Sequence, residues 1–263
     1  YLNRQRTILG ERLANAERLF ESYRKMMDTG DANILDYNKA NLERVDARTR
    51  YELNEAQRAA QCLRLNTLCG GGEDDFSELT YAAPRPLPGR EELEALYTDG
   101  DPELHSLADA LDMNRRTVTL NRALSLPRFE VGYRHNFGAE GRFKGFQLGM
   151  SIPLFENKNK VKAAKAQTLS ADARLQSART NSAAEFRELY DRALALQHSR
   201  EALESALQTQ NGLPVLDKSL EAGQITLVEY FDQIETFYRS RETLLKLDRD
   251  YQSTLARIFR FEL

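Results

Sequence analysis

The stretch "EAGQITLVEYFDQ" at residues 221–233 repeats the pattern of "DTGDANILDYNKA" at residues 28–40. When Gly30 is aligned with Gly223, the same offset of 193 residues also aligns a polar residue, an aliphatic pair, an acid and a tyrosine. Self-similarity at a fixed offset is typical of a repeated structural unit. Chance is the alternative, because many helices begin with a small residue, a polar cap and an apolar pair. The pattern predicts two similar turns between helices.

The composition limits the class of protein. The chain has 263 residues, of which 29% are charged and 41% hydrophobic, and this balance favours long helices with one polar face. The net charge of −3 argues against general nucleic-acid binding. No 18 apolar residues run together, so any contact with a membrane should come from strands. Because Tyr1 already lies in a helical pattern, we expect the sequence to be part of a longer chain.

The first part of the chain, residues 1–69, reads as one helical hairpin. Apolar residues recur at three- and four-residue steps over 1–27, which predicts a helix that ends at Gly30. A second helix is expected over 34–69, where three glycines follow. It carries an apolar row formed by Leu42, Val45, Leu53, Ala56, Ala59 and Leu63. The two helices should form an antiparallel pair.

The middle of the chain changes character twice. Residues 70–102 gather four of the seven prolines and predict an irregular crossing segment with one short helix near 90–97. Residues 103–125 predict a helix that stops before Pro127.

Residues 126–156 then alternate with a period of two, which predicts a β-hairpin with strands of about ten residues. The glycine-rich stretch "GAEGRFKG" at 138–145 is the expected turn. Strands of this length and alternation fit a bilayer crossing, although a soluble hairpin that covers a helix has the same pattern. The residues expected to face lipid are Phe129, Val131, Tyr133, Phe137, Phe146, Leu148, Met150 and Ile152.

Residues 157–263 return to the helical period and predict a second, longer helical hairpin that turns at Gly223. Beside its apolar row runs a second row of small residues, namely Ala163, Ala166, Ala173, Ser177 and Ala184. Two such rows let a helix approach two neighbours, which suits a ring of helices. The expected fold class is therefore mainly α with one β-hairpin.

Residues suited to catalysis or metal binding are sparse. The histidines at 105, 135 and 198 have no carboxylate or thiol at ligand spacing, and the sequence predicts no metal site and no cofactor. Cys62 and Cys69 are too far apart on a helix for a disulfide and are expected to be buried. No nucleophile elbow or phosphate loop is present, so we do not expect an enzyme.

Several stretches together resemble the TolC family of outer-membrane efflux proteins. They are the strand end "GMSIPLF" followed by "ENKNKVKAAKAQ", the turn "EAGQITLVEYFDQIETFYRSRETLLKLDRDYQSTLARI" and the earlier "DTGDANILDYNKANLERVDA". The resemblance implies helical hairpins that serve as staves of an α-barrel, and a β-hairpin of transmembrane type. It also implies that a signal peptide, a further helix and a first hairpin precede Tyr1.

The resemblance implies a passive conduit in the outer membrane of a Gram-negative bacterium, projecting into the periplasm. Such a protein is a homotrimer that works with a periplasmic adaptor and an inner-membrane pump, and its turns at Gly30 and Gly223 lie at the periplasmic end. The residues implied to touch the adaptor are Gly30, Asp31, Gly223 and Gln224. The acids implied to line the pore gate are Asp36, Glu229 and Asp232.

The pore-gate interpretation has a simpler alternative. Asp36 and Glu229 lie near helix starts, where the helix dipole favours an anion in any protein. The sequence also departs from the family beside the second turn, where the family places an arginine and a tyrosine and this chain has Leu220, Gln224 and Ile225. Other classes that use long helical hairpins are periplasmic adaptors and coiled-coil scaffolds, which remain alternatives.

Overall fold

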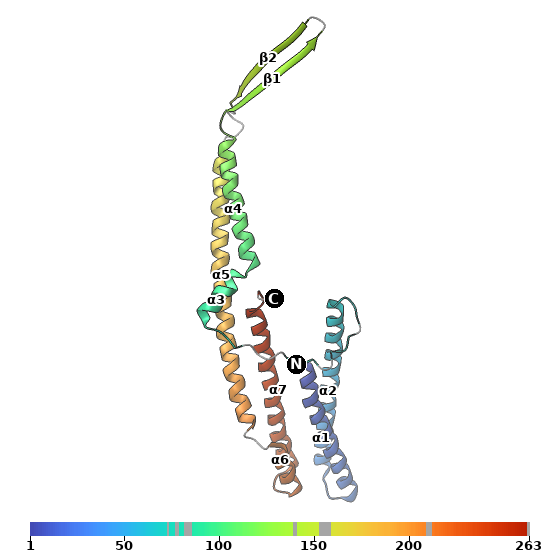
Figure 1. Cartoon of the computed structure of the whole chain (residues 1–263). Coiled ribbons are helices and arrows are strands. Elements are labelled where there is room, and N and C mark those ends of the chain that lie inside the picture. The colour runs from blue at the N-terminus through green and yellow to red at the C-terminus, as the bar shows by residue number, and fades with distance from the viewer. Residues whose placement is uncertain are drawn as a thin grey trace. The chain divides into compact units, whose positions relative to one another are not determined.

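The structure is a computed structural model that describes residues 1–263 except 73, 77–78, 82–85, 139–140, 153–158, 209–211 and 262–263. It is mainly α-helical with one β-hairpin, which confirms the expected fold class (Figure 1). The helices are α1 (Leu2–Thr29), α2 (Ile34–Leu68), α3 (Arg90–Asp99), α4 (Pro102–Ala123), α5 (Lys160–Gln208), α6 (Gly212–Glu221) and α7 (Leu227–Ile258), and the strands are β1 (Arg128–Gly138) and β2 (Gly141–Ser151).

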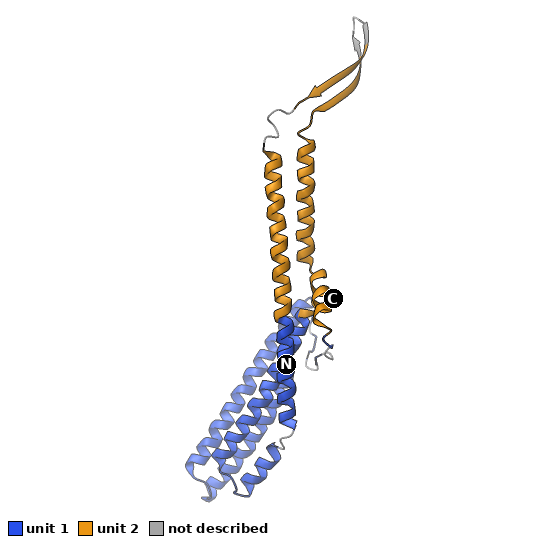
Figure 2. Cartoon of the chain, turned by 90° about the vertical axis from the view of Figure 1, so that its left-hand side faces the viewer, with its two compact units in different colours: residues 1–87, 189–257 blue, residues 88–188, 258–263 orange. Residues whose placement is uncertain are grey.

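The chain divides into two compact units (Figure 2). Unit 1 contains residues 1–87 and 189–257, and unit 2 contains residues 88–188 and 258–263. Helix α5 contributes to both units. Each unit has its own buried residues and is described separately.

In unit 1, α1 and α2 form the expected antiparallel pair. Residues later in α1 contact residues earlier in α2, as an antiparallel pair requires. Gln5 contacts Asn54, and Phe20 contacts Tyr37. The face of α2 that packs inward consists of Ala40, Ala47 and Asn54, all of them buried. Small side chains at seven-residue spacing allow two helices to approach closely.

The apolar row of α2 lies on a different face. Leu42 and Leu63 are 67% and 70% exposed, and Val45 and Leu53 are also exposed. The sequence identified this apolar row, but it did not show that the row would be exposed. The buried face of α2 is formed mainly by alanines instead of leucines. An aliphatic row this exposed is unusual for a helix that is stable alone.

Helices α6 and α7 complete unit 1. One buried cluster joins α1, α2 and α7, and apolar residues of α6 pack against it. Its members are Ile8, Leu19, Phe20, Ala40, Leu227, Tyr230, Phe231, Ile234 and Tyr238. The ends of α1, α2, α6 and α7 that contain the two repeated stretches therefore belong to the same unit.

Unit 2 is built on α3, α4 and the first part of α5. Tyr97 of α3 lies between Phe186 of α5 and Phe261, with ring centroids 5.4 Å and 5.1 Å away. Asp101 caps α4 by accepting the Glu103 N–H, and it also accepts the buried Ser182 hydroxyl at 3.0 Å. These contacts fix the start of α4 against α5.

The small-residue row of α5 is exposed, in contrast to the apolar row beside it. The apolar row includes the buried residues Ala164 and Leu175, as the helical period predicts. The second row comprises Ala163, Ala166, Ala173, Ser177 and Ala184, and all five are exposed. The structure thus leaves these small side chains uncovered within the single chain.

Strands β1 and β2 are antiparallel, and their register places the alternating apolar residues directly opposite one another. Phe129 pairs with Met150, Val131 with Leu148, and Tyr133 with Phe146. The pairs therefore share one face, as predicted, and this face is exposed, with Phe146 at 82%. Ile152 is also exposed, whereas the side chain of Phe137 lies outside the described residues.

Two expectations from the sequence were wrong. The turn expected over 138–145 is much shorter, because β2 begins at Gly141 and Gly138 pairs with it. Backbone pairing does not depend on side-chain polarity, so the charged residues after Gly141 continue the strand. The cysteines are not buried, since Cys69 is exposed and Cys62 is partly exposed.

None of the helices described in the structure is long and apolar enough to cross a membrane.

Candidate functional site

The two repeated stretches have the same backbone geometry. We call residues 26–37 the first corner and residues 219–230 the second corner. In the first, the Asp31 N–H donates to Met26 O at 2.7 Å, and in the second the Gln224 N–H donates to Ser219 O at 2.8 Å. Both the donors and the acceptors of these two bonds are 193 residues apart in the sequence. The same holds for the bonds that the Gly30 and Gly223 N–H groups donate to Met27 O and Leu220 O. The predicted repeat of the turn is confirmed.

Both corners depend on a glycine with left-handed backbone. Gly30 has a φ of 82° and Gly223 a φ of 66°, and a Cβ on either would meet nothing within 4 Å. Helices commonly end at such a residue, whose following N–H groups satisfy the last carbonyls of the helix. The glycines are therefore required by conformation and not by space.

Replacing either glycine by alanine should destabilise its corner. We expect Gly30→Ala and Gly223→Ala each to cost about 1–2 kcal/mol, the penalty for an L-residue in this conformation. The measurement is hydrogen exchange of the flanking helix ends in the full-length protein. Gly89→Ala is the matched control, because Gly89 is equally free of contacts but has a φ of −56°. An equal effect at all three positions would contradict the conformational explanation.

At the second corner, Glu229 closes a reciprocal helix cap. The Glu229 N–H donates to Thr226 Oγ1 at 3.2 Å, while Glu229 Oε2 accepts the Thr226 N–H at 2.8 Å and its hydroxyl at 2.9 Å. This is a capping box. The Thr226 N–H, and then its hydroxyl, lower the pKa of the Glu229 carboxyl below its usual value.

The first corner contains only half of this arrangement. The Asp36 N–H donates to Asn33 Oδ1 at 2.9 Å, but the shorter Asp36 carboxylate makes no return bond to the described residues. The simpler interpretation, in which the acid serves the helix end, therefore describes Glu229 better than Asp36. Asp31 and Gln224 are the residues that follow the two glycines and were predicted to touch an adaptor. The Asp31 carboxylate accepts the Thr29 hydroxyl at 2.7 Å, and Gln224 is exposed.

The tyrosines that follow the two acids also differ. Tyr230 is fully buried, and its hydroxyl donates to Asp217 at 2.7 Å and accepts from Asn15 at 2.9 Å. Burial raises the pKa of Tyr230 well above its ordinary value. Asp217 also pairs with Arg18 at 2.9 Å. Tyr37 instead packs its half-buried ring against Phe20. The Tyr230 bonds join α1, α6 and α7 beside the second corner.

Asp232, the third predicted acid, lies at a groove between α2 and α7. The groove has a volume of about 460 Å³, and its lining includes Leu42 and Val228, both exposed. The Asp232 carboxylate is exposed and has no hydrogen bond or ion pair with the described residues. Among the three predicted acids, Glu229 is held by its cap, and Asp232 is more exposed than Asp36, so Asp232 has the most available carboxylate.

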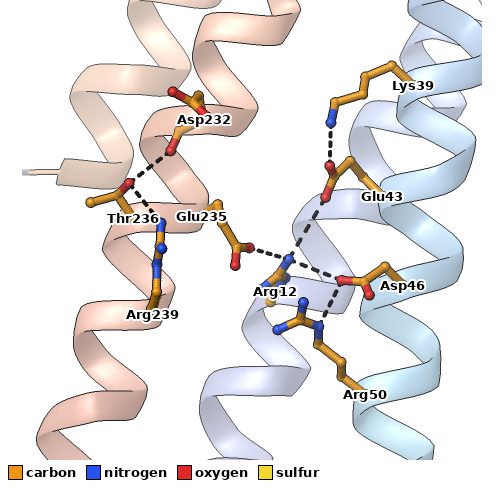
Figure 3. Close-up of polar contacts among 9 residues, drawn as sticks. All are labelled: Arg12, Lys39, Glu43, Asp46, Arg50, Asp232, Glu235, Thr236 and Arg239. Carbon is orange, nitrogen blue, oxygen red and sulfur yellow. Dashed lines mark hydrogen bonds and ion pairs between the residues drawn. The ribbon is translucent and has the colours of Figure 1, made fainter.

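The same groove contains a charged cluster that the sequence did not identify (Figure 3). The Arg12 guanidinium of α1 is buried, and its Nη2 lies 2.6 Å from Glu235 Oε2 of α7, 3.2 Å from Asp46 Oδ2 and 3.8 Å from Glu43 Oε2 of α2. Arginine in an apolar helix face is a weak signal for such a cluster, since its partners are distant in sequence.

Comparison with known protein families gives a match over the second part of the chain. The sequence model described as OEP, outer membrane efflux protein, matches residues 97–261, which is more than half of the chain. No curated protein sequence matches the chain.

Solved structures share the fold over nearly the whole chain. A membrane protein from Pseudomonas aeruginosa is 20% identical with a TM-score of 0.79, and CusC is 18% identical with a TM-score of 0.82. The outer membrane protein VceC from Vibrio cholerae is 15% identical with a TM-score of 0.80. Each comparison covers 99% of this chain but only 64% or 65% of the other protein, so the chain spans just under two thirds of their length.

The family model and the shared fold agree with the resemblance that the corners and the hairpin carry in the sequence. The chain belongs to the outer membrane efflux protein family, whose structural relatives include TolC-like channels.

Proposed function

We propose that the protein forms a passive efflux or secretion conduit in the outer membrane of a Gram-negative bacterium, with its two corners at the periplasmic end. The observation that supports this most strongly is the repeated corner, with the same backbone bonds at a fixed offset in a chain of this family. A periplasmic adaptor that contacts Gly30, Asp31, Gly223 and Gln224, together with an inner-membrane pump, would open it.

The conduit would be a homotrimer. Two exposed rows support this, the aliphatic row of α2 and the small-residue row of α5. Aliphatic residues at helical spacing are stabilised when a neighbouring helix covers them, and small residues allow close approach. A ring of copies would cover both rows and leave the polar faces of the helices in water.

The hairpin would provide the membrane-crossing part. Strands β1 and β2 have 11 residues each, which is the length that crosses a bilayer when the strands are tilted. One exposed face holds the paired apolar residues, and we assign it to the lipid side. The opposite face includes Gly132, Gly145 and Gly149, which fits a lumen.

Asp36, Glu229 and Asp232 would form a gate at the periplasmic end. In a trimer the three acids give nine carboxylates, which attract cations and repel one another. The cap holds the Glu229 carboxylate at the start of α7, so we expect the carboxylates of Asp36 and Asp232 to make most of the direct contacts with passing cations.

Neutralising the free acids should change ion selectivity. In the full-length protein, reconstituted in a planar lipid bilayer, we expect Asp36→Asn with Asp232→Asn to reduce the cation-to-anion permeability ratio severalfold. The measurement is the reversal potential in a salt gradient. Glu229→Gln is the internal control, because glutamine keeps the capping geometry, and its effect should be smaller.

Two outcomes separate the parts of this proposal. Cation selectivity that is unchanged in the double variant would remove these acids from the pore. Absence of any conductance from the purified trimer, or from the unmodified protein with its adaptor, would contradict the conduit itself.

A further inference from the structure

The Nη2 atom of the buried Arg12 has more carboxylates near it than it has hydrogens to donate. That atom carries two hydrogens, yet three carboxylates lie within 4 Å of it. The carboxylate oxygens of Glu235 and Asp46 lie 2.6 Å and 3.2 Å from Nη2, and that of Glu43 lies farther away, at 3.8 Å. The other terminal nitrogen, Nη1, is buried and has no hydrogen-bond partner among the described residues, and the guanidinium carbon lies 5.7 Å from the centre of the Tyr238 ring.

The three carboxylates differ in their other partners. Glu43 pairs with Lys39 at 2.7 Å, and Asp46 pairs with Arg50 at 2.8 Å, both within α2. No second ion pair of Glu235 occurs within the described residues. Its side chain is 35% exposed, so water can reach it. Glu235 thus depends on Arg12, whereas Arg12 does not depend on Glu235 alone.

The helices that carry these groups are attached to one another unequally. Arg12 and its α2 partners lie on an antiparallel pair whose buried face is formed by Ala40, Ala47 and Asn54. Glu235 lies on α7, on the other side of the groove (Figure 3). Breaking a buried ion pair is strongly destabilising because it leaves a buried charge uncompensated. If α7 moved away, Arg12 would keep Asp46 and could take Glu43.

We propose that Arg12 is an exchangeable pairing centre, which holds α7 through Glu235 and turns to Glu43 when α7 moves away from α1 and α2. No covalent bond changes, and the net charge of the cluster is the same in both arrangements. Because Asp46 and Glu43 both lie on α2, Arg12 would keep carboxylates beside it after Glu235 has moved away with α7. The exchange itself rests on contacts within unit 1, and its part in opening a channel rests on the proposed function.

The proposal predicts opposite effects for two acids that touch the same nitrogen. Glu235→Gln weakens the arrangement that holds α7, so hydrogen exchange across residues 227–240 of the full-length protein should speed up by about fivefold or more. Glu43→Gln weakens the alternative arrangement, so exchange in the same segment should slow. The α2 segment 38–50 should retain its protection in the Glu235 variant.

Glu17→Gln provides the matched control. Glu17 forms an ion pair with Arg48 between α1 and α2 at 2.6 Å, outside the Arg12 cluster, and its loss should leave α7 unchanged. If Glu43→Gln and Glu235→Gln shift α7 in the same direction, Arg12 is only a structural ion pair and the proposal is wrong. The same follows if Glu235→Gln leaves α7 exchange unaltered.

Conductance of the same variants separates this inference from the proposed function. Glu235→Gln should raise, and Glu43→Gln lower, the open fraction of channels in a lipid bilayer. An unmodified protein that does not conduct would contradict the proposed conduit, while the exchange measurement would still decide the role of Arg12.

Discussion

Phe186→Ala should destabilise unit 2 by about 3–5 kcal/mol, the usual cost of emptying a buried phenylalanine site. Phe186 is fully buried on α5, and its ring packs 5.4 Å from that of Tyr97. Tyr97 also holds Phe261, so the cavity would loosen α3 and the segment after Ile258 together. The measurement is hydrogen exchange of α3 and α5 in the full-length protein.

Leu169→Ala is the control on the same helix. Leu169 is 71% exposed, so its truncation should change stability by no more than about 0.5 kcal/mol. A loss below about 1 kcal/mol at Phe186 would mean that the surrounding side chains collapse into the space, since the cost of such a cavity depends on how far it can close.

Tyr230→Phe should cost about 1–3 kcal/mol, because it removes both hydrogen bonds of a buried hydroxyl and leaves the Asn15 amide group without that acceptor. The buried hydroxyl both accepts from Asn15 and donates to Asp217. Phenylalanine fills the same volume, so the change reports the hydrogen bonds and not the packing. Exchange of the α7 residues next to the second corner measures it.

The repeat supplies the control for this variant. Tyr37 occupies the matching position of the first corner, but its hydroxyl has no hydrogen bond to the described residues. Tyr37→Phe should therefore change stability by less than about 0.5 kcal/mol. Equal losses at the two tyrosines would contradict the role assigned to the Tyr230 hydroxyl.

Local features of the fold could be predicted from the sequence because their causes are local. Gly30 and Gly223 terminate helices through their own backbone conformation, and Thr226 with Glu229 forms a cap within one turn. The alternation in β1 and β2 likewise places the apolar residues on one face without reference to the rest of the chain.

Features that depend on distant segments could not be predicted. The buried face of α2 is formed by alanines because α1 lies close there, and hydrophobicity alone favoured the leucine row. The partners of Arg12 lie on two other helices, and nothing near Arg12 in the sequence indicates which acids meet it. The role of Tyr230 was missed for the same reason.

The bonds that define both corners join main-chain atoms, and the side chains on which the turn itself depends are the glycine and the capping residues. Substitutions elsewhere in the corner leave these bonds intact. Sequence drift can therefore proceed far without changing the path of the chain. Such tolerance is consistent with proteins that share only 15–20% of their residues with this chain and yet superpose on it with TM-scores near 0.8.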